Sequence, residues 1–172
     1  MVLKAINNKF TDLAQSLEYP AWTLFRVGSA AMFITHGYTK LFGANPQPFR
    51  GGGMTAISIG ELISLPMPLA INCLFIAAVI EFFGGLLLLV GLYTQWTALT
   101  AAVLMLMAYL TAHLAWFPTL NNGELAALYF LVFLVLFSYG AGPYSLDNWL
   151  SRRRQAKRNR EQQQVREMSG VG

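Results

Sequence analysis

Long apolar stretches separated by short polar connections dominate the chain. A helix needs about 20 mostly apolar residues to cross the hydrocarbon core of a bilayer. Four segments meet this requirement, and they cover residues 21–43, about 67–92, about 95–117 and about 123–141. The last two connections are short, so the segments that they join form antiparallel hairpins. The pattern predicts an all-α membrane protein, in which four transmembrane helices form a bundle.

The connection between the first and second segments, residues 44–65, is longer than the others. It begins with GANPQPFRGGG, in which glycine and proline interrupt regular structure. Its second half, MTAISIGELISL, has the pattern of a short amphipathic or re-entrant helix. We therefore expect an outer loop that contains one additional short helix.

The composition supports a membrane protein and excludes several kinds of site. Of the 172 residues, 55% are hydrophobic and 12% are charged, whereas soluble domains average about 25% charged residues. The only cysteine, Cys73, cannot form a disulfide framework, a CxxC redox pair or a zinc site within one chain. No acidic cluster suggests a metal ion, and residues 1–19 are too polar for a cleavable signal peptide.

The basic residues predict the orientation in the membrane. Seven of the twelve lie between residues 152 and 166, directly after the fourth segment, whereas residues 1–146 hold five basic and five acidic side chains. Basic segments beside transmembrane helices stay in the cytoplasm. With four spans, the N-terminal segment 1–19 and the tail 149–172 are then both cytoplasmic. We interpret the tail as a solvated topology determinant and expect no nucleic-acid partner.

Two charged residues lie deep within the apolar segments. Arg26 is about one and a half helical turns inside the first segment, and Glu81 is two to three turns inside the second. Glu81 shares a helix face with small residues, among them Gly84 and Gly85, which let another helix approach closely. A lone charge at this depth is costly. We therefore predict a buried ion pair between Arg26 and Glu81.

Other polar side chains gather toward the outer end of the predicted bundle. His36 and Lys40 are four residues apart and share a helix face, while His113 and Glu124 flank the third connection. Ionisable residues within spans are functional candidates, so these four form a candidate outer polar cluster, which Glu61 of the loop could cover. The alternative is structural, with histidines packed in the bundle and Lys40 and Glu124 extended to the interface.

Several motifs, taken in order, resemble the DoxX family over residues 20–148. They are R…HGYTKLFG, EFFGGLLLLVGLYT, AH, NNGELAALY and YGAGPYSLD. The resemblance implies a small four-helix protein of the bacterial inner membrane. It also implies importance for matching positions, which are Arg26, Lys40, Glu81, Glu124 and Asp147 together with Gly37, Gly84, Gly85, Gly91, Gly140 and Gly142. Some family members resemble subunits of thiosulfate:quinone oxidoreductase, and others are linked to membrane redox and oxidative-stress complexes.

Two classes of function fit these residues. In the first, the polar cluster hydrogen-bonds a quinone or similar electron carrier and exchanges protons with it. Because the chain has no cofactor motif, a partner redox protein supplies the electrons. A haem held by His36 and His113 is a less favoured variant, since paired histidines at similar depth arise by chance. In the second class, the chain is a non-enzymatic scaffold or small-solute carrier. The expected partners are the bilayer, the redox protein and, as an alternative, a second copy of the chain.

Overall fold

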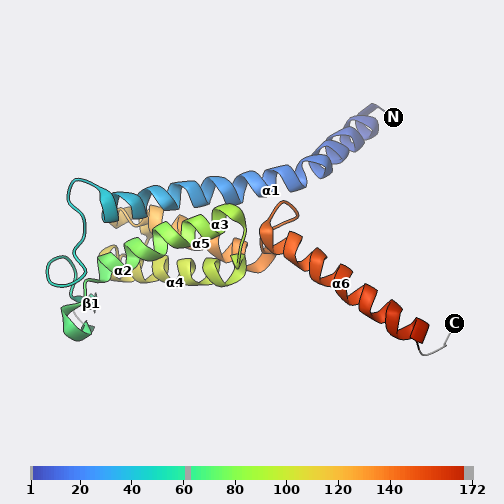
Figure 1. Cartoon of the computed structure of the whole chain (residues 1–172). Helices are drawn as coiled ribbons and strands as arrows, with labels where there is room; N and C mark the ends of the chain where they lie inside the picture. The colour runs from blue at the N-terminus through green and yellow to red at the C-terminus, as the bar shows by residue number, and fades with distance from the viewer. Residues whose placement is uncertain (1, 61–62, 169–172) are drawn as a thin grey trace.

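The fold is almost entirely helical, with one small hairpin at one end (Figure 1). A computed structural model describes residues 2–60 and 63–168. Helix α1 extends from Val2 to Phe42 and continues through Pro20, so the predicted segment 21–43 is the second half of a longer helix. Proline within a helix removes a hydrogen bond and bends the axis. The N-terminal part of α1 accordingly bends away from the bundle (Figure 1).

The second apolar segment is one continuous rod built from three helical elements. These are α2 (Cys73–Val79), the π-helix η2 (Ile80–Gly84) and α3 (Gly85–Val90). The rod begins at Cys73 rather than near residue 67, because the 3-10 turn η1 (Pro68–Ala70) ends in residues with positive φ. The buried Asn72 caps it by accepting a hydrogen bond from the Leu74 amide at 3.0 Å.

The third and fourth helices form a tightly packed antiparallel pair. Helix α4 covers Thr94–Ala112 and α5 covers Glu124–Tyr139, with the 3-10 turn η3 (Pro118–Asn121) between them. Small residues on one face of α4 let α5 approach, and the core holds Phe33, Leu88, Ala98, Ala101, Phe133 and Leu136. Two stretches, Cys73–Val90 and Thr94–Ala112, are long and apolar enough to cross a membrane, and α5 is a shorter apolar helix.

The predicted helix in the outer loop is wrong. The strands β1 (Ala56–Ile59) and β2 (Ile63–Pro66) pair as an antiparallel hairpin, with Ser58 opposite Ser64. A serine stands between two aliphatic residues in both strands, Ile57 and Ile59 in β1 and Ile63 and Leu65 in β2, and this period of two favours a strand. Gly60, at a φ of 56°, lets the chain leave β1.

Both ends of the chain leave the bundle on the same side. Helix α6 (Leu146–Met168) follows the fourth apolar helix and projects away from the bundle. It projects from the end where the N-terminal part of α1 also emerges, and the hairpin lies at the opposite end (Figure 1). The basic tail is thus an extended and exposed helix.

Candidate functional site

Glu81 lies in an unusual turn of the second rod. Residues Ile80–Gly84 form a π-helix between two α-helical pieces. A π-turn contains one more residue than an α-turn, and such turns occur frequently at functional sites. The side chain of Glu81 is almost fully buried by protein and points toward α1. The starting point for a candidate functional site is therefore the Glu81 carboxylate, which is held inside the bundle.

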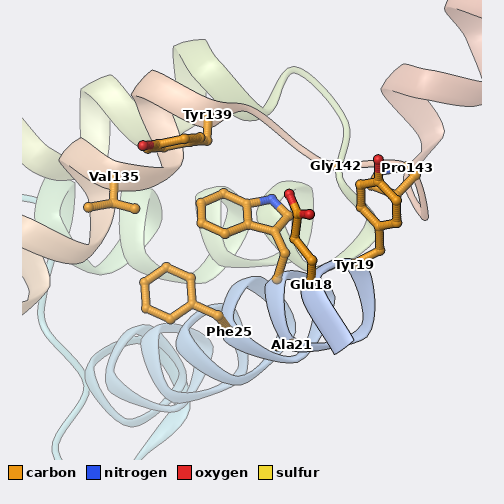
Figure 2. A pocket seen from close by; sticks show the side chains of 9 residues that line it. Glu18, Tyr19, Ala21, Phe25, Val135, Tyr139, Gly142 and Pro143 are labelled. Atoms are coloured by element: carbon orange, nitrogen blue, oxygen red, sulfur yellow. The ribbon is translucent and has the colours of Figure 1, made fainter. Parts of the chain in front are cut away.

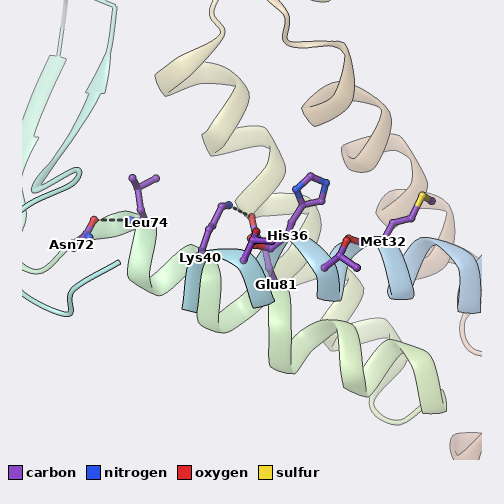
Figure 3. A network of polar contacts seen from close by, with 8 residues as sticks. Met32, His36, Lys40, Asn72, Leu74 and Glu81 are labelled. Atoms are coloured by element: carbon purple, nitrogen blue, oxygen red, sulfur yellow. Dashed lines mark hydrogen bonds and ion pairs between the residues drawn. The ribbon is translucent and has the colours of Figure 1, made fainter. Parts of the chain in front are cut away.

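The partner of Glu81 is Lys40. Its Nζ lies 2.5 Å from Glu81 Oε1, and the side chains are 34% and 4% exposed respectively. Figure 3 shows Lys40 reaching from the end of α1 to the carboxylate on the neighbouring rod. The second oxygen, Oε2, is buried and has no hydrogen-bond partner among the described residues. A buried acceptor without a donor is costly, so Glu81 holds an acceptor that the described protein groups leave unsatisfied.

The predicted pair between Arg26 and Glu81 is not formed. Arg26 is buried and donates instead to three backbone carbonyls, those of Leu88 (2.7 Å), Leu89 (3.0 Å) and Tyr144 (2.7 Å). Lys40 follows Arg26 by fourteen residues on the same helix face, which is about 21 Å along the axis. Arg26 is thus level with the end of α3, and Lys40 is level with η2.

Two aromatic side chains, His36 of α1 and Tyr129 of α5, lie close to the Lys40–Glu81 pair. His36 precedes Lys40 by one turn, and its exposed ring meets the buried Tyr129 of α5 edge-on, with centroids 6.0 Å apart. Figure 3 places His36 beside Lys40 and Glu81 on the same side of α1. We call Lys40, Glu81, His36 and Tyr129 the α1–α5 polar site.

The other members of the predicted outer cluster have different surroundings. Nδ1 of His113 lies 2.9 Å from the carbonyl oxygen of Asn121, so this histidine fastens the turn between α4 and α5. Glu124 is exposed in the first turn of α5 and makes no side-chain hydrogen bond or ion pair with described residues. Neither side chain makes a polar contact with Lys40 or Glu81. Glu61 lies outside the described residues.

Glycines bring α1 into direct contact with the second rod. A Cβ on Gly37 would lie within 2.8 Å of the carbonyl oxygen of Ala78 and closer still to the Phe82 amide. A Cβ on Gly85 would lie 2.6 Å from Ile34, whereas one on Gly84 would make ordinary contact with Thr97 at 3.4 Å. The close approach at Gly37 sets the distance across which Lys40 reaches Glu81.

Asp147 organises the opposite end of the bundle. Its carboxylate accepts hydrogen bonds from the amides of Tyr93 and Thr94, both at 2.9 Å, and so caps α4. Gly91, at a φ of 69°, leaves no room for a Cβ, which would lie 2.6 Å from the Arg26 guanidinium. Arg26, predicted as half of an ion pair, and Asp147, predicted as structural, therefore belong to one junction at this end of the bundle.

Comparison with known proteins identifies the family. The DoxX family model matches residues 21–114. The chain belongs to the DoxX family. An uncharacterized protein of Haemophilus influenzae is 40% identical over 128 residues, which are 72% of this chain and 85% of the relative. No solved structure matches the chain.

The DoxX match contains most of the α1–α5 polar site. Lys40, Glu81 and His36 all lie within the matched residues, and Tyr129 lies after them. Tyr129 was absent from the predicted site, because a tyrosine in an apolar helix resembles a core aromatic. The π-turn also leaves no mark in the sequence, since its residues are those of an ordinary apolar helix.

Two cavities flank the helices of this DoxX protein. One, of about 580 Å³, is an apolar groove between α2 and α4 that the hairpin borders; its lining includes Ile57, Cys73, Ile80, Val103 and Met107. The other, of about 630 Å³, lies between α1 and α5 near the end where the termini emerge (Figure 2), and its lining includes Glu18, Trp22, Phe25, Val135 and Tyr139.

The second cavity and the His36–Tyr129 contact both lie along the seam between α1 and α5, whereas the Lys40–Glu81 pair joins α1 to η2. Phe33 closes the seam between them, since its ring lies 4.7 Å from that of Phe133 and 5.9 Å from that of Tyr129. The side chains that separate the polar site from the second cavity are therefore apolar.

Within residues 2–60 and 63–168, no three histidine, cysteine, aspartate or glutamate side chains are placed to hold a metal ion together.

Proposed function

We propose that the chain spans the bacterial inner membrane four times, with both termini in the cytoplasm. Three features support this topology. Both ends leave the bundle on one side (Figure 1), that side carries the basic residues of α6, and the part of α1 after Pro20 is about 34 Å long. A C-terminal alkaline phosphatase fusion should be inactive, since this reporter works only in the periplasm. An active fusion would place the C-terminus in the periplasm and would refute the proposed topology.

We propose further that the α1–α5 polar site binds a quinone or a similar lipid-soluble electron carrier. The observation that supports this most is the buried Glu81 carboxylate, which keeps one oxygen without a partner beside the Lys40 ammonium. The pair offers a donor and an acceptor to one ligand. A quinone oxygen accepts from Lys40, and the hydroxyl of a quinol donates to Oε2 of Glu81.

The same residues provide the protons of the reaction. Reduction of a quinone to a quinol takes up two electrons and two protons. The electrons come from a partner redox protein, and a proton reaches the reduced oxygen through the Lys40–Glu81 pair, where a shared proton can move between amine and carboxylate. His36, one turn away, supplies an imidazole that can hand on the second proton.

The position of His36 favours a ligand that arrives through the lipid. Its ring is exposed on α1 next to Tyr129, four residues before Lys40 and six before the end of the helix at Phe42. A polar ring facing the hydrocarbon is unfavourable unless it meets a polar group. A quinone head that enters between α1 and α5 provides such a group, and its apolar tail remains in the bilayer.

The proposal is tested by the quinone content of the purified protein. Wild-type protein, extracted with solvent after mild detergent purification, should release quinone in proportion to protein. The double variant Lys40→Met/Glu81→Gln should release much less, and Lys9→Met, which removes an exposed lysine of the same helix, should match the wild type. If the wild-type protein contains no quinone, the proposal is refuted. A haem absorption band in the same protein would show that the bound electron carrier is haem.

A scaffold role is the second candidate, and the contacts of the buried Arg26 and the partly buried Lys40 favour it. Lys40 ties α1 to η2, while Arg26 ties α1 to α3 and to the segment before α6. In this case the charges fix helix packing and bind no small molecule. The double variant Lys40→Met/Glu81→Gln should then keep its stability and every partner protein found with the wild type. Neither the wild type nor the double variant should contain quinone.

A further inference from the structure

An apolar stripe runs along the N-terminal part of α1, outside the bundle. Within residues 2–19 every described side chain is exposed, yet large apolar residues recur at intervals of three and four. Their exposed fractions lie between 48% and 83%, and they are Leu3, Ile6, Phe10, Leu13 and Leu17. This spacing places them on one side of the helix, so the structure leaves a continuous apolar face without a protein partner.

The stripe continues the outer side of α1. Leu24 follows Leu17 by two turns on the same side of the helix and is itself 72% exposed. Phe33 follows Leu17 by sixteen residues, which rotates it by about 160° to the opposite side, and there it is buried in the core. The stripe thus extends the surface that α1 turns toward lipid, and it points away from the bundle.

We infer that residues 3–17 form an amphipathic helix that lies on the lipid surface of the membrane. Pro20 lies where α1 bends away from the bundle (Figure 1). The helical rotation relative to the buried Phe33 places the stripe on the side that also faces away from the bundle. The opposite side of the helix carries polar residues such as Asn8 and Gln15. Helices with this division lie at the interface with the apolar side among the acyl chains.

The charges of the segment indicate what kind of lipid surface it binds. Lys4 and Lys9 balance Asp12 and Glu18, so the apolar stripe rather than charge attraction drives the contact. Binding should therefore occur on zwitterionic lipid and resist salt. A coiled coil with a second copy is disfavoured, because the part of the stripe before the bend at Pro20 spans only about two heptads, whereas coiled coils are recognised over three or four.

The inference is tested with spin labels on the full-length protein in nanodiscs of phosphatidylcholine, loaded with one copy per disc. Labels are placed singly at Leu13, on the stripe, and at Gln15, on the polar side, in a Cys73→Ala background. Collision rates with oxygen, which concentrates in lipid, and with a water-soluble nickel complex report the surroundings of each label. The ratio of oxygen to nickel collisions should be several-fold higher at Leu13 than at Gln15.

Matched variants test whether the stripe itself makes the contact. Phe10→Asp, which puts a charge on the stripe, should lower the ratio at Leu13 to that of Gln15, whereas Asn8→Asp on the opposite side should leave it unchanged. Equal nickel access at both labels in the parent protein would overturn the inference. Shielding of Leu13 that appears only with two copies per disc would assign the stripe to a second copy and would also overturn it. None of these results depends on a bound quinone.

Discussion

Removing Lys40 and removing Glu81 should have unequal effects on stability. The Glu81 side chain is 4% exposed and has one unpaired oxygen already, whereas that of Lys40 is 34% exposed and lies near the end of α1 at Phe42. In Lys40→Met, the carboxylate loses its only charged partner inside the bundle. Breaking a buried pair in this way costs about 3 kcal/mol. In Glu81→Gln, the freed ammonium can extend toward the outer interface, and the cost falls to about 1 kcal/mol.

The double variant Lys40→Met/Glu81→Gln should recover most of the loss, since no charge remains buried. Unfolding in mixed micelles with increasing dodecyl sulfate gives the free energies of unfolding for the four proteins of the cycle. The reasoning is wrong if the two single losses simply add, or if Glu81→Gln costs as much as Lys40→Met. Lys9→Met, which removes an exposed lysine, provides the baseline.

Three further changes test the helix contacts. Gly37→Ala should lower the thermal unfolding temperature markedly, because its Cβ overlaps the Phe82 backbone, whereas Gly28→Ala, with open space around its Cβ, should be neutral or slightly stabilising. Arg26→Met should cost about 3 kcal/mol in the same micelle titration, because three carbonyls lose a charged donor; a loss below that of a surface arginine would contradict the assignment. Asp147→Ala should cost about 1–2 kcal/mol by uncapping α4, with faster amide exchange confined to its first turn.

The sequence could predict helix faces better than it could predict pairs between helices. The depth of Glu81 and the small residues near it correctly indicate a face toward another helix, since these follow from periodicity alone. Arg26 and Lys40 lie on the same face of α1, however, so periodicity cannot choose between them. The choice depends on how far the rod is shifted along α1, and that shift depends on where the rod begins. Its start at Cys73 follows from the hairpin and from Asn72, which the helix prediction for the loop had missed.

The partners of Arg26 could not be found by searching for opposite charges. Its acceptors are carbonyl groups at the end of α3 and at Tyr144, and every residue type carries such a group. Gly91 is the one local signal, because its small size and positive φ admit the guanidinium. In the outer cluster, the sequence likewise places His113 and Glu124 at the correct end, but the bond from His113 to Asn121 depends on the fold of the turn.

The contacts of Arg26 also have a consequence for biogenesis. During synthesis, α1 leaves the ribosome long before Tyr144, which follows Arg26 by 118 residues. The guanidinium gains the carbonyls of Leu88 and Leu89 when the second rod is inserted, but its last acceptor arrives only after α5 is complete. A nascent chain that stops before this point carries an incompletely satisfied cation at the helix junction. The hydrogen bonds of Arg26 are therefore complete only once the chain has been synthesised as far as Tyr144.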